Sequence, residues 1–101
     1  MVTENGQTYL IMDGYRVQVF SSNNQRQSKQ EAEEKEKKVN ETFPDLKTYK
    51  TYDAPFWRVR VGDYHSYEEA HEALRQLKAA FPAFAKEMYI VGNEKIKIRL
   101  Y

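Results

Sequence analysis

The chain has 101 residues, and its 16 basic and 15 acidic side chains leave a formal net charge of only +1. A single domain of this size buries a modest core without a metal or disulfide, and its near-neutral charge excludes a global attraction to nucleic acid or anionic membranes. The absence of cysteine excludes disulfides and thiol catalysis.

The chain has neither a membrane-spanning apolar run of ~20 residues nor a secretory signal in its first residues. It is therefore expected either to be cytoplasmic or to be part of a longer exported protein.

The first predicted elements are an N-terminal extension over residues 1–14 and a strand over residues 15–20. The extension starts with a polar segment, residues 1–8, that is expected to be loose. Alternation in the strand predicts one set of side chains that meets the helices and one that faces outward. The inward set is Tyr15, Val17 and Val19, and the outward set is Arg16, Gln18 and Phe20.

The next elements are a helix and a hairpin. Ser28 and Glu31 have the spacing of a capping box, which predicts a helix from Ser28 to Phe43, ended by the proline that follows. Residues 46–52 and 56–61 are rich in Thr, Tyr and Val and flank a short turn, so they are predicted to be antiparallel neighbours.

The second half of the chain repeats the first. Tyr15-Arg16-Val17-Gln18-Val19 returns as Trp57-Arg58-Val59-Arg60-Val61, and each copy precedes a Ser-x-x-Glu-Ala helix start and a Phe-Pro stop. The second helix is predicted over residues 66–81 and the last strand over residues 88–91. The alternating residues 95–101 are either a fifth strand or an extension of the fourth.

This order of elements, βαββαβ, predicts an α+β, ferredoxin-like domain over residues 15–101. Its antiparallel sheet has both helices on one face, and the repeated strands lie side by side in the middle. Their outward side chains would then form a shallow, cationic surface with two aromatic rings. These residues are Arg16, Gln18, Phe20, Phe56, Arg58 and Arg60.

Aromatic rings stack on sugars or bases, and guanidinium groups bind carboxylate or phosphate in a bidentate manner. A purely structural alternative is that the polar side chains are the solvated half of two amphipathic strands, with the two phenylalanines covered by a chain terminus.

From about Tyr15 to Val91 the chain resembles a SPOR domain. Tyr15-Arg16-Val17-Gln18-Val19 matches the family's first strand in part, and Trp57-Arg58-Val59-Arg60-Val61-Gly62-Asp63-Tyr64 followed by Ser66-Tyr67-Glu68-Glu69-Ala70 matches its second block closely. The resemblance implies a domain of the bacterial envelope. The acidic residues cluster on the first helix as a solvated face, so the domain is expected to be non-enzymatic and without a cofactor. Its expected ligand is peptidoglycan, with a preference for glycan strands stripped of stem peptides at division septa.

Transferred by residue, the resemblance assigns the family's glutamine to Gln18, its small polar position to Ser21 and its third-strand aromatic to Phe56. By parity, Trp57 is predicted to lie on the core side. Many members have Gly-Ser-Phe after the glutamine, where this chain has Val19-Phe20-Ser21.

The resulting hypothesis is a glycan-binding domain in the periplasm or cell envelope, attached to a membrane only through a segment upstream. Removal of a stem peptide leaves a lactyl carboxylate on muramic acid, with which the arginines are expected to pair. The predicted contacts are Gln18, Phe56, Arg58 and Arg60, supported by Arg16, Phe20 and Ser21.

Two other functions are alternatives to glycan binding. A single-stranded RNA binder shares this topology, but the chain lacks that family's aromatic motif and its excess positive charge, so no nucleic-acid partner is expected. A protein-interaction module would use the edge strand formed by residues 95–101. His65 and His71 lack metal-binding spacing, so no metal site is predicted.

Overall fold

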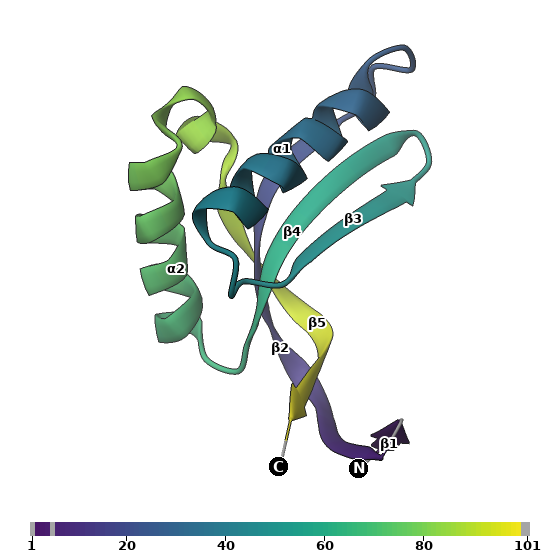
Figure 1. Cartoon of the computed structure of the whole chain (residues 1–101), viewed down its shortest axis with the longest axis vertical. Helices are drawn as coiled ribbons and strands as arrows, with labels where there is room; N and C mark the ends of the chain where they lie inside the picture. Colours follow the sequence, from purple (N-terminus) through teal and green to yellow (C-terminus); the bar gives the residue numbers. More distant parts are fainter. Residues whose placement is uncertain (1, 5, 100–101) are drawn as a thin grey trace.

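The computed structural model describes residues 2–4 and 6–99 and has a strand and helix order that matches the predicted ferredoxin-like fold (Figure 1). The elements are β1 (Val2–Glu4), β2 (Gln7–Ser22), α1 (Ser28–Thr42), β3 (Thr48–Asp53), β4 (Phe56–Tyr64), α2 (Tyr67–Ala80), the 3-10 helix η1 (Pro82–Glu87) and β5 (Tyr89–Arg99). Both α-helices lie within two residues of their predicted bounds.

The sheet is antiparallel, with the order β3-β4-β2-β5, and β1 pairs with the start of β2. The two repeated segments are therefore central neighbours, as predicted. In the middle of the sheet one row of partners crosses all four long strands, because Gln18 pairs with both Arg60 and Tyr89, and Arg60 pairs with Tyr49.

Both helices cover the same face of this sheet and enclose the core. Four valines of the central strands are fully buried there, and they meet apolar side chains from both helices. The strand residues are Val17, Val19, Val59 and Val61, and the helix residues are Ala32, Val39, Ala73 and Leu77. The second face of the sheet carries no helix.

The two helices begin differently. The Ser66 hydroxyl accepts a hydrogen bond of 3.2 Å from the Glu69 amide and caps α2. The predicted capping box at Ser28 is wrong, since Ser28 is buried and makes no side-chain cap. A turn at residues 25–27 precedes α1, and there the Asn24 side chain accepts hydrogen bonds from the amides of Arg26 and Gln27.

The long strands β2 and β5 continue past the helices as a two-stranded ribbon, visible at the lower end of Figure 1. Residues 94–99 are thus an extension of the last strand, and Tyr101 and Leu100 lie outside the described residues. The expected loose segment is in fact strand over residues 2–4 and from Gln7 onward, because it pairs within the sheet. Within residues 2–4 and 6–99, no helix has the length and apolar character needed to cross a membrane.

Candidate functional site

The face of the sheet that lacks helices is called here the open face. Residues paired across neighbouring strands share a face, so the register identifies its members. They are Tyr49, Thr51 and Asp53 of β3, Phe56, Arg58 and Arg60 of β4, Arg16, Gln18 and Ser21 of β2, and Tyr89 and Val91 of β5.

A bulge in β2 removes one predicted residue from this face. Gln18 pairs with Arg60 but Phe20 pairs with Val59, so Val19 is an extra residue that interrupts the alternation. Phe20 therefore lies with Val59 in the core and is only 4% exposed. The prediction that Phe20 faces outward is wrong, since the strand does not alternate regularly there.

The same bulge brings Ser21 to the open face, where it pairs with Arg58. Strict alternation from Val17 and Val19 would have directed Ser21 toward the core. The family resemblance assigns Ser21 to the site. A bulge, which the periodic pattern does not predict, places this residue beside Arg58.

A second bulge lies in β4 at Gly62. Tyr15 pairs with Tyr64 and Val17 with Val61, so two residues of β4 lie opposite Arg16. Gly62 has a φ of +80°, which is the backbone conformation that such a bulge requires and that glycine adopts without strain. The bulge directs Asp63 toward Arg16, whose guanidinium donates two hydrogen bonds of 3.2 and 3.1 Å to the Asp63 carboxylate.

A third irregularity lies in β5. Gly14 pairs with Glu94 while Arg16 pairs with Val91, so β5 has one more residue than β2 over this stretch. The Glu94 carboxylate consequently reaches the open face and forms a short ion pair with Arg60. Its second oxygen lies 3.9 Å from the Arg16 guanidinium.

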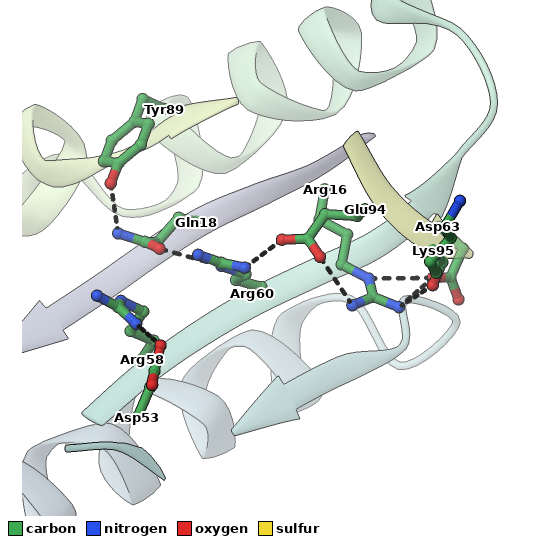
Figure 2. A network of polar contacts seen from close by, with 9 residues as sticks. All are labelled: Arg16, Gln18, Asp53, Arg58, Arg60, Asp63, Tyr89, Glu94 and Lys95. Carbon is green, nitrogen blue, oxygen red and sulfur yellow. Dashed lines mark hydrogen bonds and ion pairs between the residues drawn. The ribbon is translucent and has the colours of Figure 1, made fainter. Parts of the chain in front are cut away.

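These side chains form a continuous polar chain across the sheet, shown in Figure 2. The Gln18 amide donates a 2.7 Å hydrogen bond to the Tyr89 hydroxyl and accepts one of 3.1 Å from Arg60 Nε. Beyond Arg60 the chain continues through Glu94 to Arg16, as described above. Gln18 is only 2% exposed, so it lies on the predicted face but beneath its neighbours.

Each arginine of the open face has a carboxylate partner. Arg16 pairs with Asp63 and Glu94, Arg60 with Glu94, and Arg58 with Asp53 at 2.7 Å. Three guanidinium groups thus meet three carboxylates, and this cluster has no net charge. The expectation of a cationic surface is wrong because Asp63 and Glu94 arrive through bulges and Asp53 from the hairpin turn.

Tyr49 closes one end of this cluster. Its ring lies 3.9 Å under the Arg16 guanidinium, and its hydroxyl donates a short hydrogen bond to Asp63. Burial, together with the hydrogen bond to Asp63, raises the pKa of Tyr49 to about 12. The phenol is therefore held in its neutral, donating form.

Besides Tyr49, the open face carries the aromatic side chains of Tyr89 and Phe56. Tyr89 is 52% exposed, and Phe56 is half-buried with the Arg58 guanidinium 5.1 Å from its ring centre. Tyr89 is not among the contacts predicted from the sequence, although the alternation of Met88, Tyr89 and Ile90 indicates that its ring faces outward. Asp63 and Glu94 had no comparable signal, since bulges place them.

Trp57 lies on the helix side, as predicted, and packs against the core. Its ring lies 4.9 Å from that of Tyr52, and both line a cavity of about 150 Å³ beside the start of α1. Over the described part of the chain, no three His, Cys, Asp or Glu residues are grouped so that they could hold a metal ion.

The comparison with protein-family models identifies a SPOR domain over residues 12–86, about three quarters of the chain. No curated protein and no solved structure gave a match. SPOR domains are non-catalytic modules that bind peptidoglycan in the cell envelope. The observed fold is the one expected for this family, and the match covers more than half of the chain. The chain therefore belongs to the SPOR domain family.

Proposed function

We propose that this domain binds peptidoglycan glycan strands without stem peptides through its open face, in the periplasm or cell envelope, and directs its parent protein to the division septum. It does so without catalysis or a cofactor. The observation that carries the proposal is the oblique strip formed by Tyr89, Ser21, Arg58 and Phe56, which has an accessible ring at each end.

Rings at the two ends of such a strip suit an extended sugar chain. Aromatic faces pack against the apolar faces of sugar rings, while the hydroxyl and guanidinium groups between them hydrogen-bond to sugar substituents. A stem peptide on a muramic acid would hold the strand away from a shallow sheet. A stripped strand can lie directly on it, which supports the preference for stripped strands.

Among the three arginines, Arg58 is the best placed to meet a lactyl carboxylate. Its partner Asp53 has a side chain that is 78% exposed, and ion pairs at such sites contribute only about 0–1 kcal/mol. A ligand carboxylate can replace Asp53 at little cost. Arg16 and Arg60 are held by less exposed carboxylates and act mainly in shaping the face.

Gln18 acts through its neighbours. With 2% exposure and hydrogen bonds to both Tyr89 and Arg60, it orients the ring at one end of the strip and the guanidinium beside it. Replacement by glutamate (Gln18→Glu) removes the donor to Tyr89 and adds negative charge beneath an anionic ligand. Weaker binding to stripped strands is expected, and unchanged affinity would show that Gln18 is not part of the site.

The neutral character of the open face supports a sugar ligand over RNA. Binding to RNA depends on unpaired cations and weakens steeply with salt. Here each guanidinium already has a carboxylate partner, so sugar binding with weak salt dependence is expected.

The decisive test is co-sedimentation with amidase-treated cell-wall material. Tyr89 and Tyr67 make a matched pair, because both are 52% exposed but Tyr67 lies on α2. Tyr89→Ala should weaken binding about fivefold or more, since loss of one stacking contact removes about 1 kcal/mol or more. Tyr67→Ala should bind as the unmodified domain does.

Two results would count against the proposal. Absence of binding to stripped strands would contradict the proposed ligand. Equal binding by both tyrosine variants would show that the site does not lie on the open face. Septal targeting has its own test, since an exported fluorescent fusion should form a band at the division site and an even outline would contradict that role.

A further inference from the structure

The Glu94 carboxylate lies between two guanidinium groups of the open face, as Figure 2 shows. It makes a short ion pair with Arg60 and lies 3.9 Å from Arg16. We infer that Glu94 is a specificity-determining residue, which occupies the anion position between Arg16 and Arg60 and leaves only neutral sugar groups to bind at that position. This inference rests on the proposed glycan-binding function.

The geometry is that of a filled anion site. Carboxylates bind between guanidinium groups by charge-assisted hydrogen bonds, and an incoming lactyl carboxylate would need the same donors. The Glu94, Arg16 and Arg60 side chains are 21%, 16% and 25% exposed. Their mutual attraction is therefore screened less than that of a fully exposed pair, and an external anion does not readily replace Glu94.

Glu94 is supplied by the ribbon rather than by the central fold. It follows the irregularity in β5 and pairs with Gly14, where β2 and β5 continue beyond the helices. The segment that matches the SPOR family model ends at residue 86, so Glu94 lies outside it. The carboxylate that fills the anion position is thus supplied by a part of β5 that the family match does not cover.

The charge balance predicts what the removal of this carboxylate would do. Arg16 would keep Asp63 as its partner, and Arg58 would keep Asp53. Among the described residues, Arg60 would keep only the neutral Gln18 oxygen, at 3.1 Å from its Nε. The variant Glu94→Gln therefore leaves one guanidinium without a carboxylate partner on the open face while it preserves the size of the side chain.

Two ligands with the same β-1,4-linked backbone separate charge from sugar recognition. Amidase-stripped strands have a lactyl carboxylate on each muramic acid, and chitooligosaccharides have none. Glu94→Gln should raise the affinity for stripped strands about tenfold and make it fall more steeply with salt, because a new charge-assisted contact forms. Its affinity for chitooligosaccharides should stay unchanged.

The control is Glu68→Gln, which removes the same charge from an exposed position on α2 and should alter neither affinity. Glu94→Ala should reproduce the gain, and thermal unfolding of both Glu94 variants verifies their fold. The inference is overturned if the Glu94 variants bind stripped strands no better than the unmodified domain, or gain equally for both ligands.

Failure of the proposed function gives a different pattern. An unmodified domain that binds stripped strands, with no gain on Glu94→Gln, overturns only the role of Glu94. Binding by the Glu94 variants alone supports that role and shows that stripped strands are not the ligand of the natural chain. Absence of binding by every variant overturns both.

Discussion

Replacement of Phe20 by alanine tests whether the bulge in β2 places this ring in the core. Regular alternation would expose Phe20 beside Phe56, where truncation would cost little stability. In the structure Phe20 is 4% exposed, packs with Val59, and has the Lys35 ammonium 5.8 Å from its ring centre. Phe56 lies on the opposite face and is half-buried, so it is the matched control.

The expected cost follows from this burial. Truncation of a buried phenylalanine to alanine costs about 3–5 kcal/mol, since it removes buried apolar area and leaves a cavity. For a domain of this size, each kcal/mol lowers Tm by about 4–8 °C, so Phe20→Ala should lower Tm by more than about 10 °C. Phe56→Ala should cost less than about 1 kcal/mol and should weaken glycan binding.

Urea denaturation measures both free energies of unfolding, and sedimentation with amidase-treated wall material measures binding. A folded Phe20→Ala domain should retain its affinity at a temperature well below its Tm. The reasoning is refuted if Phe20→Ala costs less than about 1 kcal/mol and reduces binding as Phe56→Ala does, because Phe20 would then lie on the open face.

Two further predictions concern Gly62 and Tyr49. Gly62 and Gly6 both have a φ of +80°, but a Cβ on Gly62 would lie 2.2 Å from the Tyr64 ring whereas one on Gly6 meets nothing within 4 Å. In urea denaturation, Gly62→Ala should therefore cost about 1–3 kcal/mol more than Gly6→Ala, and equal costs would show that the Tyr64 ring moves away freely. Because the pKa of Tyr49 in the folded state, about 12, exceeds its ordinary value of 10.0, its contribution to stability is complete below pH 10 and is lost as the pH rises toward 12. Tyr49→Phe should thus lose less stability than the unmodified domain over this interval, and parallel losses would contradict the assignment.

Much of the architecture could be predicted because it depends on local periodicity. The apolar spacing of the helices, the prolines that end them and the repeated Arg-Val strands identify the elements and their order. The predicted βαββαβ order and central strand pair are confirmed. The capping box at Ser28 was not, since a turn formed by Asn24 takes its place.

The site was predictable only in part. Parity correctly places Arg16, Gln18, Phe56, Arg58 and Arg60 on the open face, and it would have placed Tyr89 there as well. It fails wherever one strand contains an extra residue. The bulge in β2 places Phe20 in the core and Ser21 on the open face, and the irregularities in β4 and β5 bring carboxylates to the arginines.

The sequence by itself determined which segments form helices and strands, how they connect and which family they belong to. Only the tertiary structure decided the charge and accessibility of the open face. The physical reason is that a side chain's face depends on the count of residues between paired positions on two strands. That count depends on how β2, β4 and β5 pair with one another, so the sequence of one strand alone does not give it.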